Sequence, residues 1–467
     1  MKAIRIYIVL SIIMLNTACE SFLETEPRQS ISNEVALEDL AGLEAALVGL
    51  YDDFQATALY GRNNIVIPEL LSDNIRIAQQ NSNRLVNHSF NAEFSHADNW
   101  DANYNAINKA NNLIAFADDA SGTTANDVAR IKGTAFFFRG LAYHDLVKAY
   151  GRNPNHLIDN FDLGVPLVLQ PFQGLDDSAF PSRNTVFEVY DQIESDLLEA
   201  INLLTDDGFP HFATDLAAKA LLARVYLFEG RWADAAAMAN EVINESPVGL
   251  ETGDDYIEIF RNSSESLFEL FYSDVETNAA TVYYVKTPEG AGNGDGVLRD
   301  DMIEQYDAND KRAALLIDAI QGPETVTFNL KFNSYNGTQF VDNIALLRIS
   351  EMYLIRAEAN FENNSSTGAS PLDDINTLRT RAGLPDLTNL TLDDIMTERR
   401  IELAFEGHRF WDLKRRGMDI PKGKEGTIDC GDECVIPYTD HRVVDSLFQG
   451  ELDTNKNLVN NPGYSTN

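Results

Sequence analysis

The chain has 467 residues, of which 44% are hydrophobic and 10% aromatic, a composition typical of a globular protein with a large core. Acidic residues outnumber basic residues by 73 to 36, which gives a formal net charge of -37. This excess of acid argues against a protein that holds nucleic acid or an anionic membrane surface through a broad basic patch.

The first eighteen residues have the features of an export signal. Two basic residues precede an apolar run over residues 6–15 that is too short to span a bilayer. A threonine and an alanine stand directly before Cys19, as in a bacterial lipoprotein box, although the asparagine at position 16 is unusual there. We therefore expect residues 1–18 to be removed, Cys19 to carry a lipid and residues 19–33 to form a tether. The loss of two basic residues and no acidic residue changes the net charge from -37 to -39.

Helical periodicity begins after the tether. Over residues 34–51, four leucines recur at the spacing of one helix face. The periodicity is lost over residues 73–99, which are rich in Asn, Gln and Ser, and this segment is predicted to be a long loop of the kind that often carries function. It resumes at Trp100, and the aromatic stripe of residues 135–151 predicts a further helix whose aromatic side chains pack in the core.

The clearest repeat unit lies at residues 222–247. Its small and large residues fall at the spacings of a tetratricopeptide helix pair, in which small residues let two helices approach and large ones fill the space between them. Similar stretches elsewhere are not separated by a constant interval of 34 residues. The sequence therefore predicts a mainly α fold, with an interrupted scaffold of helix pairs whose first part covers residues 34–250.

Between residues 251 and 340 the character of the sequence changes. Two short runs that favour β-structure, SLFELFYS and ATVYYVK, occur here together with the glycine-rich segment PEGAGNGDG. The glycines do not match a dinucleotide-binding fingerprint, because no strand-to-helix unit flanks them. We expect an inserted lobe that is irregular and partly β, and after it a second helical region over residues 341–467.

Cys430 and Cys434 are the cysteines that remain after Cys19, and three residues separate them. In an exported protein such a pair predicts a disulfide across a small loop, although two free thiols are the alternative. A structural zinc site would need further His or Cys ligands that are not close in sequence, so we expect no metal.

Residues 346–417 are the most strongly patterned part of the chain. Apolar spacing predicts a helix over residues 346–359. Serine and proline at 370–371 predict the start of a second helix, and the pair Thr391 and Asp394 predicts the start of a third.

Three glutamates of this third helix, Glu398, Glu402 and Glu406, are spaced four residues apart and would share one stripe. Such carboxylates can act as general acids or metal ligands. Arginines are interleaved with them, however, and this pattern is more typical of an ion-pair network that orients helices. The arginines are Arg399, Arg400 and Arg409.

The order of the motifs EMYLIRAEA, DINTLRTRAGLP and ERRIELAFEGHRFWDLKRRG closely resembles the carboxy-terminal signature of the SusD/RagB family. The final segment LDTNKNLVNNPGY and the start CESFLETEP are similar to that family as well. The resemblance implies a lipid-anchored protein on the extracellular face of the outer membrane, with no cofactor and no enzymatic activity. It implies capture of an oligosaccharide, or in some members a peptide, by a protein that sits as a lid over a TonB-dependent transporter of the SusC type.

Sugar rings stack on aromatic faces, and their hydroxyls pair with planar polar side chains. The two irregular segments supply both kinds of residue, although no family motif transfers to individual positions. We expect the ligand where the 73–99 loop meets the 272–335 lobe, and the negative charge favours a neutral glycan unless Arg76 and Arg84 form a basic pocket. The candidates are Asp73, Asn74, Arg76, Gln79, Asn81 and Arg84 in the loop, and Tyr272, Tyr283, Tyr284 and Tyr335 in the lobe.

Four alternatives stay open at this point. Each of the four tyrosines has packing within the lobe as its other interpretation. The protein as a whole has a peptide-binding role, or a purely structural role in assembling a transporter, as its other functions. A glycoside hydrolase would need two carboxylates facing each other across a cleft, and no sequence motif indicates such a pair.

Overall fold

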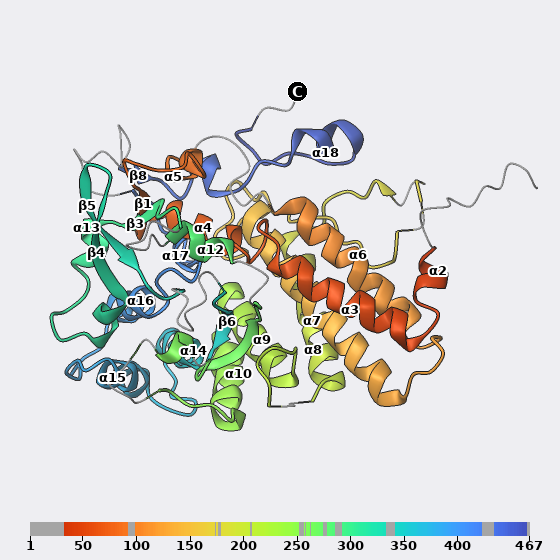
Figure 1. Ribbon diagram of the computed structural model, residues 1–467, viewed down its shortest axis with the longest axis horizontal. Coiled ribbons are helices and arrows are strands. Elements are labelled where there is room, and N and C mark those ends of the chain that lie inside the picture. The colour runs from red at the N-terminus through yellow and green to blue at the C-terminus, as the bar shows by residue number, and fades with distance from the viewer. Residues whose placement is uncertain are drawn as a thin grey trace, which may run out of the picture.

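The structure is a computed structural model that describes most of the chain from residue 32 onward (Figure 1). The described residues are 32–91, 99–172, 174–175, 179–205, 208–251, 256, 258–261, 263–273, 278–284, 292–332, 341–422 and 434–464. The fold is mainly helical with small two-stranded sheets, as the sequence predicts.

The scaffold is a row of helices in which each packs against the next along the chain (Figure 1). α3 packs on α6 and α7, and the row continues from α6 to α10. The helices of the row are α3 (Leu40–Gln55), α6 (Trp100–Phe116), α7 (Ala125–Tyr150), α8 (Val186–Leu203), α9 (Asp215–Glu229) and α10 (Trp232–Glu245). Two further helices of this part of the chain, α2 (Asn33–Ala36) and α4 (Asn63–Leu70), lie outside the row.

The helix that continues this row after α10 comes from beyond the predicted lobe. α14 (Ile349–Glu362) packs against α10, and α15 (Pro371–Arg381) and α16 (Leu392–Glu402) pack against α14. Helices that are distant in sequence are thus neighbours in the row, with the lobe segment inserted between them. α17 (Arg409–Arg415) comes next in the chain and packs against α4.

Local sequence explains where these helices begin. Thr391 and Asp394 form the predicted capping box of α16, and Ser370 caps α15 with Pro371 in its first turn. α9 ends at Glu229, and Gly230 caps it with a left-handed φ of 69°, at the turn that leads into α10 and completes the tetratricopeptide-like pair.

Three sequence-based expectations about elements are wrong. Residues 344–348 form strand β6 (Ile344–Arg348) and not the start of α14, because this segment pairs with β2 (Ser266–Leu270). The run ATVYYVK, expected to favour β-structure, contains helix α12 (Ala279–Tyr284). The stripe of glutamates is interrupted, because α16 ends at Glu402 and Glu406 lies in the turn after it.

The remaining elements of the lobe and its surroundings are short. β1 (Ile75–Ile77) pairs with β3 (Gly296–Leu298), β4 (Leu316–Gln321) with β5 (Glu324–Asn329), and β7 (Ile420–Pro421) with β8 (Val435–Ile436), each antiparallel. The short helices are α5 (Val86–Ser89), α11 (Glu258–Arg261), α13 (Asp300–Ile303), η2 (Lys311–Leu315), η3 (His441–Val443) and α18 (Gln449–Thr454).

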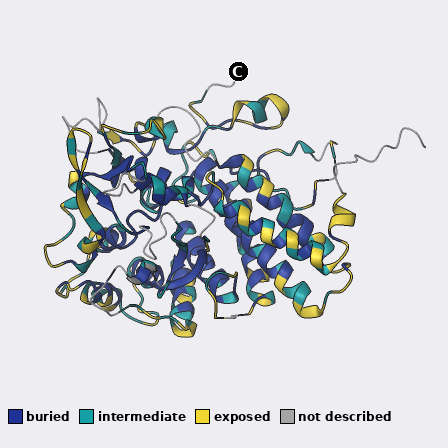
Figure 2. Ribbon diagram, viewed as in Figure 1, coloured by how far each residue is buried: buried dark blue, intermediate teal, exposed yellow. Residues whose placement is uncertain are grey.

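The core runs along the inner faces of the helix row, which are buried while the outer faces are exposed (Figure 2). The aromatic stripe of α7 belongs to it, since Phe137 and Phe138 are fully buried and meet Phe268 of β2 edge to face. Trp100 is also a core residue, packed against Tyr150. Among the described residues, no helix combines the length and the hydrophobicity needed to cross a membrane.

Candidate ligand-binding face

The predicted loop and the lobe lie side by side. β1 lies within the 73–99 segment, and its three residues pair with β3 of the lobe in the register Ile75 with Leu298 and Ile77 with Gly296. α5 packs against β1 and α4. We call the described part of this junction, residues 79–90 together with the turn between β4 and β5, the loop–lobe face.

Two carboxylates of the lobe hold the loop in place. Glu324 accepts a hydrogen bond from the backbone N–H of Gln79 at 2.6 Å and forms an ion pair with Arg76 at 2.9 Å. Asp295 accepts one from the backbone N–H of Ser82 at 2.8 Å and one from its hydroxyl. Because these bonds fix the backbone of the loop, its neighbouring side chains are positioned before any ligand arrives.

The turn between β4 and β5 adds a third attachment. Gly322, at the first central position of this two-residue turn, has a φ of 61°, as this kind of hairpin requires. The side chain of Gln321 donates to the backbone carbonyls of Gln80 at 2.9 Å and Asn293 at 3.1 Å. A Cβ on Gly322 would lie 2.5 Å from the side-chain oxygen of Gln80, so glycine also permits this close contact.

Several polar side chains of the loop–lobe face reach solvent. Gln79, Asn83, Arg84 and Asn87 are exposed, and Asn81 is half-buried with its amide bonded to the carbonyl of Ala78. Left-handed backbone at Asn83 and Leu85, with φ of 61° and 58°, turns the chain sharply before α5. The face thus presents amides and one guanidinium from a loop of defined shape.

Phe90, at the end of α5, is an aromatic side chain that the sequence-based candidates do not include. It is 54% exposed beside this polar segment. An exposed phenylalanine in a segment with exposed amide side chains offers a flat apolar face on which a sugar ring can stack. The sequence feature that could have identified Phe90 is its position as an aromatic residue within a polar stretch that lacks helical periodicity.

Asp73 and Asn74 do not belong to the exposed surface. Asp73 is buried between Arg409 and Arg400, at 2.7 and 3.1 Å. Asn74 is fully buried between Arg400 and Glu69, with hydrogen bonds of 2.8 and 2.6 Å. Burial opposes ionisation of Asp73, but the two arginines lower its pKa, so the carboxylate stays charged. Both residues therefore hold the base of the loop through buried contacts.

The expectation that the lobe tyrosines face solvent is also wrong. Tyr283 and Tyr284 are each 1% exposed, because α12 packs against α4. Tyr272 is 5% exposed, and its hydroxyl donates to the carbonyl of Gln55. These rings fill the core and are covered on both faces, so a glycan cannot stack on them in this structure. Tyr335 lies outside the described residues.

The interleaved charges of the carboxy-terminal motif form a buried ion-pair network, as predicted. Glu402 lies at its centre and contacts Arg381 at 2.6 Å, Arg348 at 3.3 Å and Arg312 at 3.3 Å. Burial would raise its pKa, but these arginines hold the pKa well below its ordinary value. The partners come mostly from distant segments, and Arg399 pairs instead with Asp412 at 2.9 Å.

Glu69 connects this network to the loop. Its carboxylate accepts from the side chain of Asn74 and from the backbone N–H groups of Gly407 and His408, at 2.6, 2.9 and 3.2 Å. Burial raises the pKa of Glu69 to about 7, while these hydrogen bonds oppose the shift.

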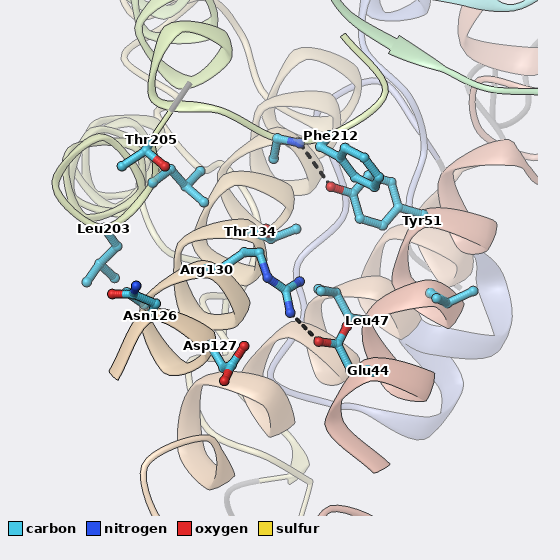
Figure 3. A pocket seen from close by; sticks show the side chains of 14 residues that line it. Glu44, Leu47, Tyr51, Asn126, Asp127, Arg130, Thr134, Leu203, Thr205 and Phe212 are labelled. Carbon is cyan, nitrogen blue, oxygen red and sulfur yellow. Dashed lines mark hydrogen bonds and ion pairs between the residues drawn. The ribbon is translucent and has the colours of Figure 1, made fainter. Parts of the chain in front are cut away.

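Two cavities lie elsewhere, on either side of residues 208–213. The larger, about 610 Å³, lies between α3, α7 and the end of α8 (Figure 3). The smaller, about 310 Å³, lies between residues 208–216, 247–248 and 263–267. Three of its lining residues, Ser263, Ser266 and Asn343, donate hydrogen bonds to the buried carboxylate of Glu269.

Within the described ranges, no group of three or more His, Cys, Asp or Glu residues is arranged to hold a metal ion. Cys434 is disulfide-bonded, and Cys430 lies outside the described residues, so the pairing of these two cysteines stays a prediction.

Comparison with known protein families decides to which family the chain belongs. Residues 324–464 match the model of the SusD family, and residues 21–227 match a model described as "Starch-binding associating with outer membrane". The chain belongs to the SusD family. The two matched regions contain the buried ion-pair network and the loop, respectively.

Full-length relatives support this assignment. SusD-like protein P2 of Formosa agariphila is 27% identical over 533 residues, covering 99% of this chain and 100% of the relative. SusD-like protein P38 of the same organism is 25% identical and covers 90% of this chain and 92% of the relative.

Solved structures of SusD proteins share the fold. A putative sugar binding protein from Bacteroides vulgatus has a TM-score of 0.81 at 26% identity, over 92% of this chain and 100% of that one. A laminarin binding SusD-like protein has a TM-score of 0.75 at 25% identity, over 91% of this chain and 100% of that one.

Proposed function

We propose that this SusD-family protein binds a neutral oligosaccharide at its loop–lobe face and delivers it to a TonB-dependent transporter of the SusC type. The observation that carries the proposal is Phe90, an exposed aromatic ring in the same segment of the chain as the exposed amides of Gln79, Asn83 and Asn87. The C–H face of a sugar ring can stack on the phenylalanine ring, and its hydroxyls can form hydrogen bonds with the amides.

The properties of relatives support the same class of ligand. One matched family model is described as starch-binding, and one solved structure with 25% sequence identity is a laminarin binding protein. Starch and laminarin are both uncharged. We infer a neutral polysaccharide fragment as the ligand of this chain as well.

The charge of the chain favours a neutral ligand over a polyanion. The net charge is -37, and Arg76 is paired with Glu324, so the basic pocket considered from sequence reduces to Arg84. The excess negative charge repels a uronate or sulfated chain. At physiological salt this repulsion is screened beyond a Debye length of about 8 Å.

We propose binding without catalysis. The glutamates of the carboxy-terminal motif are held in buried ion pairs with Arg312, Arg348 and Arg381, and so do not face a substrate. Incubation of the protein with maltoheptaose or laminariheptaose should leave both intact by chromatography. Release of shorter products by the pure protein, and not by the Phe90→Ala variant, would instead indicate a hydrolase.

We further propose that Cys19 carries a lipid that anchors the protein at the outer face of the outer membrane. The sequence support is the short apolar run that ends in small residues before Cys19. Metabolic labelling with a fatty acid should mark the wild type and not Cys19→Ala. Labelling that persists in Cys19→Ala would refute the anchor.

The transporter partner has its own test. Affinity purification of the tagged, full-length protein from solubilised outer membranes should recover a TonB-dependent transporter in comparable amount. Recovery of the protein alone, under conditions that keep a known SusD-family complex intact, would contradict this step and leave glycan binding unaffected.

A glycan array tests the binding function. The soluble form that begins after Cys19 should bind neutral oligosaccharides, bind uronate and sulfated chains weakly, and give a weaker signal for neutral oligosaccharides on Phe90→Ala. If the protein binds no glycan on the array but binds peptides from a peptide library, the peptide-binding alternative is favoured.

A further inference from the structure

We propose that the larger cavity, between α3, α7 and the end of α8, is a second sugar-binding site. The inference rests on the proposed function, because it assigns the same class of ligand, a neutral oligosaccharide, to another part of the surface. The cavity measures about 610 Å³, which lies within the range of about 300 to 1,000 Å³ typical of small-molecule sites.

One wall of the cavity is aromatic and rigid (Figure 3). The rings of Tyr51 and Phe212 stand at 89° to each other with centroids 6.4 Å apart. The hydroxyl of Tyr51 accepts a hydrogen bond from the N–H of Ala213 at 2.9 Å, and its ring packs edge to face on buried Phe138 at 4.7 Å. These contacts fix residues 212–213 on α3 and leave the ring of Phe212 52% exposed.

The opposite rim carries planar polar side chains. Glu44 of α3 and Arg130 of α7 form an ion pair across it, and Asn126 and Thr205 line the same cavity (Figure 3). Both members of the ion pair are more than one-third exposed, so their pairing adds little stability and is readily exchanged for hydrogen bonds to a ligand. Carboxylate, guanidinium and amide groups together can pair with the hydroxyls of a sugar ring.

Apolar side chains also line the cavity. They are Leu47, Val48, Leu203 and Leu204. A sugar ring fits this arrangement because it has C–H groups on its faces and hydroxyls on its perimeter. A purely aliphatic ligand would leave the charged rim unused, and a polyanion would meet Glu44 and Asp127 in a chain of net charge -37.

This site is separate from the loop–lobe face. α5, β1 and the β4–β5 hairpin lie at one end of the molecule, whereas α3 and α8 lie toward the other (Figure 1). Two separate sites on one chain allow a polysaccharide to be held at two points, which raises its apparent affinity without new contacts at either site.

Titration calorimetry of four variants with maltoheptaose and with laminariheptaose tests the proposal. Wild type should bind two equivalents of at least one of these probes, and Phe90→Ala and Phe212→Ala should each weaken a different one of the two by about tenfold or more. Arg130→Ala should weaken the same equivalent as Phe212→Ala by about tenfold or more, as expected for loss of roughly 1.4 kcal/mol. Phe187→Ala removes an exposed phenylalanine of α8 that lines neither cavity, and should match the wild type.

The outcomes separate this inference from the proposed function. If Phe90→Ala abolishes all binding while Phe212→Ala and Arg130→Ala match the wild type, the second site is refuted and the first stands. If the wild type binds neither probe, both are refuted. If Phe212→Ala and Arg130→Ala bind glycan normally but lose the transporter in affinity purification, the cavity is a protein interface and the inference is overturned.

Discussion

Arg409 holds Asp73 through hydrogen bonds of 2.7 and 3.0 Å, although 336 positions separate the two residues in the chain. Arg400 binds the same carboxylate and, through its Nε, the side chain of Asn74. The carboxy-terminal motif therefore fixes the base of the loop that carries the exposed side chains. Through this contact the buried carboxy-terminal motif can position the proposed binding loop.

Replacing Arg409 by alanine should loosen the loop. Asp73 would stay buried with Arg400 as its remaining partner, so the free energy of unfolding should fall by about 3 kcal/mol, near the low end for a broken buried ion pair. Backbone amides of residues 73–84 should exchange their hydrogens faster than in the wild type. Unchanged exchange in this segment would show that the other attachments of the loop hold it without Arg409.

Replacing Glu402 by alanine should be more severe. Arg312, Arg348 and Arg381 would lose their common partner while buried, and the loss of a buried partner costs about 3 to 5 kcal/mol. Denaturant unfolding measures this change. Asp393→Ala, on the exposed side of the same helix, is the matched control and should unfold like the wild type. Equal midpoints for both variants would contradict a stabilising role for the network.

Glu69 should make the stability of the protein depend on pH. Burial raises its pKa from 4.5 to about 7, so the folded state binds the proton more tightly than the unfolded chain. Its contribution to stability should therefore decline as the pH rises from 4.5 to 7 and stay constant above 7, by about 3 kcal/mol in total. Glu69→Gln cannot ionise and should lack this decline. Parallel stability curves for the two proteins over this interval would rule out the shift.

Variants of Tyr283 test whether this residue packs in the core and does not contact a ligand. Its hydroxyl is buried and, among the described residues, has no hydrogen-bond partner. Tyr283→Phe should therefore leave stability unchanged or raise it by up to about 1 kcal/mol. Tyr283→Ala should lower stability by about 3 to 5 kcal/mol because it leaves a cavity in the core. Thermal unfolding distinguishes these expectations from those for a solvent-facing ligand residue, for which both variants would unfold like the wild type.

Helix starts and the ion-pair network were predictable from sequence because they depend on local patterns. Thr391 and Asp394 are three residues apart, and interleaved acidic and basic residues indicate ion pairs at short range. The partners of Glu402 were not predictable, since Arg312 and Arg348 come from the lobe and from β6. Distant partners depend on the packing of α14, α16 and the lobe.

The candidate site was predictable as a region but not residue by residue. Composition indicated the loop, and the pairing of β1 with β3 brings it to the lobe. That Asp73 and Asn74 are polar residues did not reveal that they are buried. Their burial depends on Arg400 and Arg409, which are distant in the sequence. The sequence could not distinguish the buried Tyr283 from the exposed Phe90, because both are aromatic. Tyr283 is buried because α12 packs against α4.

The central claim is that the loop–lobe face binds a neutral glycan. Its most direct test is calorimetric titration of the soluble protein and Phe90→Ala with laminariheptaose and maltoheptaose, with Phe448→Ala as the control for another exposed phenylalanine. We predict that Phe90→Ala weakens binding at this face by about tenfold or more, equivalent to roughly 1.4 kcal/mol, with an unchanged unfolding temperature. Phe448→Ala should bind like the wild type. Equal affinity of Phe90→Ala and the wild type for a glycan that the protein binds would contradict the claim.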